Sequence, residues 1–300
     1  MAYQLKNEQL RVEIAELGEA YQGTRFDGAG FITGVELNGR HQFCVPESLT
    51  PGAGTGGIGI CSEFGIKEAI GYEDTRIGEL FPKLGVGLLT RPDEAEYQFY
   101  RDYACQRFET RVEQKGEQQI CFTTLPAECR GYAARVQKNI EISGNTLSVT
   151  YTVENIGSRI LTTDEYSHNF LGFDGDEVGP DYVLKLPFAP RTWSDDPATL
   201  EGLVFEGDQV TWERRPEKDF YFRMDAFDGR ETPWLWELRH RPSGLTVREV
   251  SKLPLSSAAV WGHRHVISPE MFVAVHIAPG EQQSWTRSYE FNKFHENSAE

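Results

Sequence analysis

The sequence has few features of an α-helical, membrane-spanning or disulfide-rich protein. No window of about 12 residues keeps the apolar stripe of an amphipathic helix without an interrupting Gly or Pro. No stretch approaches the roughly 18 apolar residues of a membrane span, and the first residues lack the apolar core of a secretory signal. The 5 cysteines form no CxxC pair, which speaks against a disulfide framework or a zinc site. We therefore expect a cytoplasmic protein that has no membrane partner.

Positive charge is also scarce. Lys and Arg number 30 against 46 Asp and Glu, so the formal net charge is −16. Such a surface repels polyanions, which makes nucleic acid and anionic membranes poor partners. The acidic residues are spread along the chain, and their plain role is to keep the protein soluble.

Several catalytic and nucleotide-binding signatures are missing as well. The sequence has no GxSxG element, no kinase set and no dinucleotide fingerprint in a βαβ context. Its one low-complexity stretch, TPGAGTGGIGI at residues 50–60, lacks the GK[ST] ending of a phosphate loop and opens no helix. We interpret this stretch as a mobile loop that borders a cleft.

Short runs of alternating apolar and polar residues dominate the chain. Residues 136–153 give two such runs around Gly144 and Asn145, a pattern typical of a β-hairpin. Further candidate strands lie at residues 9–14, 97–103, 119–123, 246–250, 272–277 and 284–291. Many short strands between turn residues, with 12% aromatic residues, predict an all-β sandwich. We expect one sandwich domain over residues 1–291 and a polar tail at 292–300.

Two segments hold candidate reactive groups. His168 lies in TDEYSHNFLG, where it is either a hydrogen-bonded core residue or a general acid, since histidine titrates near neutrality. Asn169 beside it is a candidate substrate ligand. Glu270 follows Pro269 at the start of an apolar strand, where it is either a solvated carboxylate or a partly buried base with a raised pKa.

A second histidine group precedes Glu270. His263 and His265 are two residues apart, which on one strand places them on the same face. Their spacing is far less specific than HExxH, so we predict no metal site and keep His263 as a candidate substrate ligand. Trp261 is another candidate, because an aromatic ring could cover a sugar face; Trp234 and Trp236 share this possibility but could equally belong to the core.

Cations gather between glycines and aromatic residues in residues 66–89. Arg76 and Lys83 could bind sugar hydroxyls or grip a phosphate together with Lys67, and Arg25 is a weaker candidate of the same kind. The other interpretation is that they are surface charges paired with neighbouring carboxylates.

The second half of the chain resembles the aldose 1-epimerases of the galactose mutarotase-like superfamily. The resemblance lies in NIEISGNTLSVTYTVENIGSRILTTDEYSHNFLGFDG, in AVWGHRHVISPE and in SPEMFVAVHIAPGEQQSWTRSYEF, in that order over residues 136–291. It implies a large antiparallel β-supersandwich with the site on the concave face. It also implies that His168 is the acid and Glu270 the base that open and reclose an aldose ring. The sequence departs from the family in lacking its N-terminal His-Gly-Gly motif and its Asn-Arg pair, for which only Arg76 and Lys83 are nearby substitutes.

The resemblance implies interconversion of α and β anomers, with the acid and base on opposite sides of one pyranose. This chemistry needs no cofactor. The expected partner is a small-molecule sugar or sugar phosphate, and the expected state a monomer or homodimer. The alternatives are a sugar-phosphate mutarotase, in which the cations grip the phosphate, and a non-catalytic carbohydrate-binding or regulatory protein on the same fold. A lyase or hydrolase would need a second carboxylate facing the glycosidic bond, and only Glu270 has support.

Overall fold

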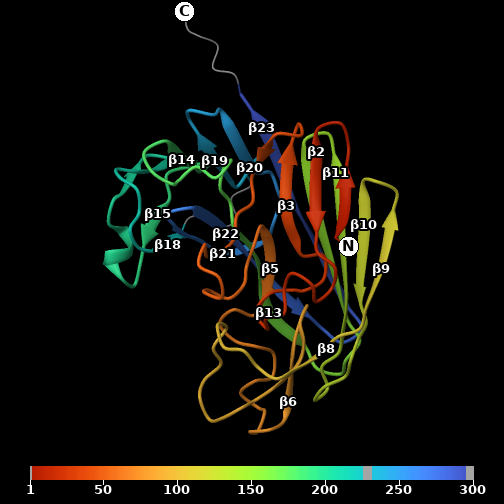
Figure 1. The fold of residues 1–300 in the computed structure, drawn as a ribbon. Helices are drawn as coiled ribbons and strands as arrows, with labels where there is room; N and C mark the ends of the chain where they lie inside the picture. The colour runs from red at the N-terminus through yellow and green to blue at the C-terminus, as the bar shows by residue number, and fades with distance from the viewer. Residues whose placement is uncertain (1, 226–231, 295–300) are drawn as a thin grey trace, which may run out of the picture.

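The alternating runs of the sequence form antiparallel strands throughout the described chain. The computed structural model describes residues 2–225 and 232–294, and every strand pair within them is antiparallel (Figure 1). The described residues contain no α-helix and one short 3₁₀ helix, η1 (Pro197–Leu200). The predicted all-β class is therefore confirmed.

The first of two large sheets, called sheet I here, has the order β1-β2-β3-β5-β13-β22-β21-β18-β15, with β4 paired to β3. Its strands are β1 (Tyr3–Lys6), β2 (Leu10–Ile14), β3 (Ile32–Leu37), β4 (His41–Gln42), β5 (Ile60–Phe64), β13 (Leu161–Asn169), β15 (Arg191–Trp193), β18 (Phe220–Asp225), β21 (Leu255–His263) and β22 (Val266–Ile277).

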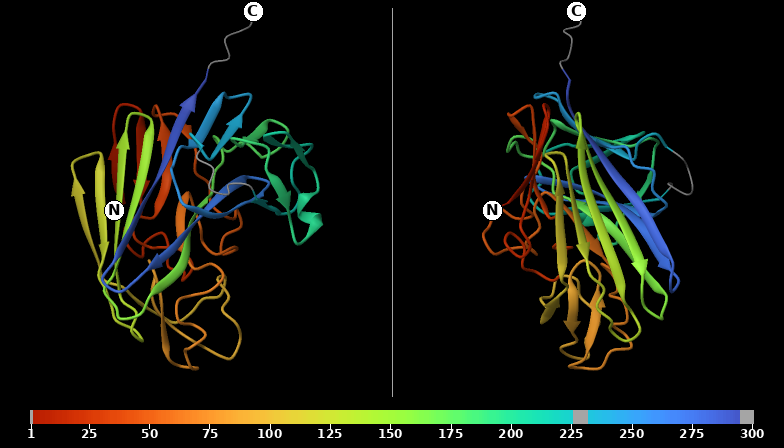
Figure 2. Two further views of the ribbon diagram at one scale, coloured as in Figure 1. Left: turned by 180° about the vertical axis from the view of Figure 1, so that it is seen from behind. Right: turned by 90° about the vertical axis from the view of Figure 1, so that its right-hand side faces the viewer.

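The other large sheet, called sheet II here, has the order β16-β17-β14-β19-β20-β23-β12-β11-β10-β9. Its strands are β9 (Thr110–Lys115), β10 (Gln119–Thr124), β11 (Ala134–Ser143), β12 (Thr146–Asn155), β14 (Tyr182–Lys185), β16 (Leu203–Glu206), β17 (Gln209–Trp212), β19 (Trp236–His240), β20 (Leu245–Glu249) and β23 (Gln282–Lys293). A small sheet of β6 (Leu80–Lys83), β7 (Gly87–Thr90) and β8 (Cys105–Arg107) forms a separate lobe, at the bottom of the views in Figure 2.

The predicted hairpin is present as β11 and β12. Residues Ser143 and Thr146 close the ladder around Gly144 and Asn145. Gly144 has a φ of +56°, a left-handed conformation that glycine adopts without strain. The local sequence is thus sufficient to set this register.

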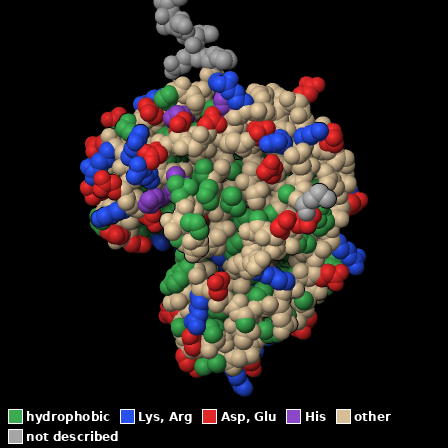
Figure 3. All heavy atoms as spheres, viewed as in Figure 1, with side chains coloured by type: hydrophobic (Ala, Val, Ile, Leu, Met, Phe, Trp, Pro, Cys, Tyr) green, Lys and Arg blue, Asp and Glu red, His purple; other side chains and the backbone are tan. Residues whose placement is uncertain are grey.

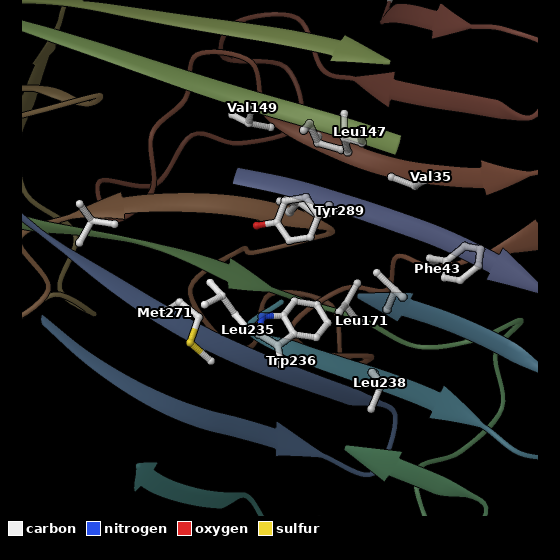
Figure 4. Close-up of a cluster of buried hydrophobic side chains, with 14 of the residues drawn as sticks. Val35, Phe43, Leu147, Val149, Leu171, Leu235, Trp236, Leu238, Met271 and Tyr289 are labelled. Carbon is white, nitrogen blue, oxygen red and sulfur yellow. The ribbon is translucent and has the colours of Figure 1, made fainter. Parts of the chain in front are cut away.

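The core lies between the two large sheets, because each sheet turns one row of alternate side chains toward the other. Figure 4 shows apolar side chains from both sheets in this layer, among them Leu171 and Met271 of the sheet I side and Trp236 and Tyr289 of sheet II. All four are fully or almost fully buried. Burial of this apolar surface is the main force that holds the sheets together.

A buried ion triad also joins the sheets. Arg287 of β23 donates to Glu165 of β13 at 2.8 Å and to Glu249 of β20 at 3.3 Å. The same guanidinium donates to the carbonyl of Met271 on β22 at 2.7 Å. Arg287 therefore ties sheet II to the two adjacent strands of sheet I that carry the candidate residues His168 and Glu270.

Two expectations about chain segments need correction. Residues 97–103, predicted as a strand, form a turn in which Arg101 N donates to Gln98 O, because Tyr97 and Tyr103 stack on each other (centroids 5.7 Å apart) instead of alternating across a sheet. The predicted tail begins inside β23, since Asn292 and Lys293 continue the ladder with β20. Residues 295–300 of that tail lie outside the described residues.

Two further findings concern the cysteines and possible membrane-spanning helices. All 5 cysteines are free. No helix in the described part of the chain has the length and apolar character needed to cross a membrane.

Candidate active site

A pocket of about 840 Å³ lies on the face of sheet I that points away from sheet II. The alternation of β13 creates this face: Glu165 points into the layer between the sheets, so His168, three residues along the strand, points to the other face and lines the pocket. Loops from the N-terminal half, including Thr55 and Phe99, form the opposite wall. In Figure 3 the outline of the molecule steps inward between the part that carries β15 and β18 and the lobe of the small sheet.

The register of sheet I brings His168 and Glu270 together. β13 and β22 pair with Tyr166 opposite Phe272, and two residues further along the same register His168 stands opposite Glu270. The Nε2 atom of His168 lies 3.2 Å from the Oε1 atom of Glu270. Both side chains line the pocket and are only about one-twentieth exposed (5% and 6%), so they form its floor.

Aromatic rings fix the imidazole. Phe170 stacks on His168 with centroids 4.1 Å apart and planes 12° apart, and Trp261 meets it edge-on at 5.3 Å. Phe26 closes a further side at 6.0 Å. These contacts remove water from the ring, which disfavours its charged form.

Ser268 connects the two reactive side chains. Its Oγ donates to Glu270 Oε1 at 3.3 Å, lies 2.8 Å from His168 Nδ1, and accepts from the backbone N–H of Asn169 at 3.0 Å. While Ser268 donates to Glu270, its single proton is used, and it accepts from Nδ1. In that arrangement His168 carries its hydrogen on Nδ1, and the lone pair of Nε2 faces Glu270.

Burial shifts both pKa values toward the neutral forms. Desolvation, and next the positive charge of Arg25, hold the pKa of His168 well below 6.5. Desolvation raises the pKa of Glu270 to about 8, against the opposing effects of Arg25 and the Ser268 hydrogen bond. Both shifts favour the state in which Glu270 holds the proton and His168 keeps a lone pair on Nε2. The roles implied by the sequence resemblance are the reverse.

Arg25 is a buried cation in the wall of the pocket. Its guanidinium donates to Glu63 Oε2 at 2.8 Å and to Tyr166 Oη at 2.9 Å. It is also sandwiched between the rings of Phe26 and Phe99, at 4.5 Å and 4.4 Å. From the sequence Arg25 is only a weak candidate ligand for a sugar or phosphate. Nothing in the neighbouring residues indicates its contacts with Glu63 and Tyr166, which lie far along the chain.

Four of the predicted substrate ligands do not line the pocket. Arg76 is exposed in the loop before β6. Lys83 is buried behind the wall, where its ammonium donates to Glu63 at 3.1 Å and to Tyr97. Asn169 points to the other face of β13 and donates to the carbonyl of Pro269 at 2.6 Å. His263 lies at the rim, with its Nε2 3.9 Å from Asp219.

Trp261, the fifth predicted substrate ligand, does line the pocket. The exposed Lys67, predicted as a possible phosphate contact, lines it too. Trp236 is fully buried and donates to Glu249, so it belongs to the core. His265 follows β21 in a turn and is therefore not on the strand, although its ring still lies 6.0 Å from that of His263. Within residues 2–225 and 232–294, no group of three or more His, Cys, Asp or Glu side chains is arranged to hold a metal ion.

The sequence missed several pocket residues, chiefly Phe99, Tyr221, Arg223 and Trp193. Tyr221 and Arg223 alternate on β18, a signal for one shared face but not for which face.

Comparisons with known proteins support the fold of the chain. No family model and no curated protein matches the sequence. Among solved structures, the chain is similar to Slr1438 from Synechocystis sp. PCC 6803 (11% identity, TM-score 0.63, 98% of this chain and 96% of that chain covered).

A putative aldose 1-epimerase from Escherichia coli K12 gives 14% identity and a TM-score of 0.61, with 98% of this chain and 99% of that chain covered. A galactose mutarotase related enzyme from Lactobacillus acidophilus gives 13% identity and a TM-score of 0.62, with 99% of each chain covered. The chain therefore has the galactose mutarotase-like fold, which confirms that expectation.

Proposed function

We propose that the protein is an aldose 1-epimerase that interconverts the anomers of a sugar by acid–base ring opening. The observation that carries the proposal is the 3.2 Å contact between His168 Nε2 and Glu270 Oε1 on the floor of an aromatic pocket. Mutarotation needs one acid and one base, and this pair holds one proton and one lone pair near neutral pH.

The adjacency of the two groups fits the atoms that react. The ring oxygen and the hydroxyl oxygen of an anomeric centre are both bonded to C1. An acid and a base side by side can therefore reach both, and they need not lie on opposite sides of the ring as the sequence resemblance implied.

The proton transfers balance within the pair. Glu270 gives its proton to the ring oxygen while His168 Nε2 takes the proton of the C1 hydroxyl. The C1–O5 bond breaks and C1 becomes an aldehyde carbon. After rotation about C1–C2, the O5 hydroxyl attacks the other face of C1, returns its proton to Glu270, and the carbonyl oxygen takes the proton held by His168.

Charge separation arises only in the open-chain state. There the pair consists of an imidazolium and a carboxylate in contact, and their attraction in a water-poor site offsets part of the cost of charging them. Ser268 supports this state because it accepts from His168 Nδ1–H and donates to Glu270. Arg25 adds a fixed positive charge that favours the carboxylate.

The pocket favours a neutral sugar over a sugar phosphate. Arg25 is already paired with Glu63, and Arg223 with Asp195 at 3.7 Å. Lys67 at the rim is the cation that a phosphate would engage. The net charge of −16 also disfavours an anionic substrate.

Polarimetry tests the proposal. The decay of optical rotation is followed for freshly dissolved α-glucose, α-galactose, maltose and glucose 6-phosphate, with the spontaneous rate subtracted. We expect wild type to accelerate at least one neutral sugar and His168→Ala and Glu270→Gln to lower kcat about 10²–10⁴-fold. His276→Ala, exposed on the same strand as Glu270, is the matched control. Spontaneous rates for wild type on every sugar, or full activity in both site variants, would refute the proposal.

A further inference from the structure

One row of side chains runs from the reactive pair to the edge of sheet I. In the strand registers, Glu270 of β22 faces Ala259 of β21, Ala259 faces Arg223 of β18, and Arg223 faces Trp193 of β15. Residues directly opposite in a sheet share one face, and all four line the pocket. Neighbouring strands lie about 4.8 Å apart, so three steps place Trp193 roughly 14 Å from Glu270.

The row forms the bottom of a trough. Ala259 contributes only a methyl group between Glu270 and Arg223, so the floor is low there. Trp261 and Tyr221, which face each other on β21 and β18, make one wall two residues along the strands. The trough is therefore continuous from the reactive pair outward, across the strands.

The outer end of the trough is an exposed indole. Of the six tryptophans, all within the described residues, Trp193 alone is an exposed one, with 38% of its surface open. The guanidinium of Arg223 packs over its ring at 4.7 Å and donates to Tyr221 at 3.1 Å. Arg223 thus holds the indole in place at the pocket edge.

The trough is longer than one sugar ring. Bonds of about 1.5 Å make a pyranose with its hydroxyls roughly 6–7 Å wide. A volume of about 840 Å³ lies near the upper end of the roughly 300–1,000 Å³ typical of pockets for drug-sized ligands. One ring over His168 and Glu270 covers only about half of the roughly 14 Å to Trp193, so a second ring can reach the indole beside the Arg223 guanidinium.

We propose that the substrate is a reducing disaccharide, whose reducing ring lies over His168 and Glu270 and whose second ring packs on Trp193. The proposal rests on the epimerase function, because that chemistry requires a free C1 at Glu270. C4 lies across the ring from C1, so the linkage toward Trp193 is a 4-linkage. The apolar C–H face of the second ring covers the indole, and its hydroxyls reach Arg223 and the exposed Asp225.

The test compares α-glucose with maltose and cellobiose in mutarotation assays. We expect wild type to have at least tenfold higher kcat/KM for one of the disaccharides than for glucose, and Trp193→Ala to lower that ratio at least tenfold. Phe294→Ala, an exposed aromatic residue outside the pocket, should leave the ratio unchanged. An equal or lower value for both disaccharides in wild type, or an unchanged ratio in Trp193→Ala, would overturn the proposal.

A binding measurement separates this proposal from the epimerase function. In Glu270→Gln, calorimetric titration should give at least tenfold tighter binding of the preferred disaccharide than of glucose, and adding Trp193→Ala should remove the difference. Tighter disaccharide binding without turnover by wild type would sustain the second-ring site and reject the epimerase. Turnover of glucose together with equal binding of both sugars would do the opposite.

Discussion

The Nε2 atom of His168 and the Oε1 atom of Glu270 lie 3.2 Å apart, although the two residues are separated by about a hundred positions in the sequence. Adjacent antiparallel strands bring them opposite each other, and burial holds both near their neutral forms. This relationship leads to the first predictions.

The pH dependence of kcat/KM should report the proton content of the pair. Above a pH of about 8 Glu270 loses the shared proton, so activity should fall about tenfold per pH unit. On the acid side the activity should hold below 6.5, because the pKa of His168 is well below that value. The apparent values belong to the coupled pair. Polarimetry over pH 5–10 checks this; activity that still rises at pH 9 would contradict it.

Glu270→Gln should remove a pH-dependent destabilisation. The pKa of Glu270 rises from 4.5 to about 8 on folding, so between these pH values the folded state holds a proton that the unfolded state has lost. Stability then falls as pH rises, by at most about 1.4 kcal/mol per pH unit. In urea unfolding, the free energy of unfolding of the variant relative to wild type should increase by up to about 4 kcal/mol between pH 5 and 8. The exposed Glu117→Gln should give no such gain.

Ser268→Ala should lower kcat while leaving KM within about threefold. Ser268 contacts both reactive side chains but does not itself form a wall of the pocket. Its replacement by Ala therefore removes the hydrogen-bond partner of His168 Nδ1 without changing the pocket wall. We expect a decrease of roughly 10–100-fold, less than for the acid or the base itself. Ser288→Ala, in sheet II, is the control. An unchanged kcat would show that the His168 lone pair needs no such partner.

Gly57→Ala should impair catalysis through Phe170. A Cβ at position 57 would lie 2.2 Å from the Phe170 ring, which stacks on His168. The ring must shift, so we expect at least a tenfold loss of kcat, together with lower stability from overpacking of about 1–3 kcal/mol. Gly28→Ala meets no atom within 4 Å and should be near neutral. Measurements of kcat and of urea unfolding for both variants test this prediction, and equal values for the two variants would contradict it.

Arg287→Met should be the most destabilising of these changes. It leaves Glu165 and Glu249 buried without their cation, which costs about 3–5 kcal/mol for a broken buried pair. Arg248→Met breaks a partly exposed pair with Glu290 on the same strands, β20 and β23, and should cost about 1 kcal/mol or less. Denaturant titrations of the two variants give the comparison. Equal losses would mean that the triad is dispensable.

The sequence by itself determined the local features of this protein. Alternation of period two gave the strands, and Gly144 with Asn145 closed the hairpin of β11 and β12, because both depend on neighbouring residues alone. The resemblance to a known family singled out His168 and Glu270, which do share one pocket; their catalytic role stays a prediction. Local pattern misled at residues 97–103, where stacking of Tyr97 on Tyr103 replaced strand pairing.

Only the tertiary structure decided which side chains meet and which charges survive. Strand order and register brought Trp193 into the row of Glu270 and sent Lys83 behind the wall, and neither follows from nearby sequence, because partner strands are chosen by packing across the whole core. From the sequence Arg76 and Lys83 were stronger candidate ligands than Arg25, yet Arg25 alone of the three lines the pocket. The raised pKa of Glu270 has the same origin: removal of water depends on everything that surrounds a group, and the sequence around a single residue does not contain that information.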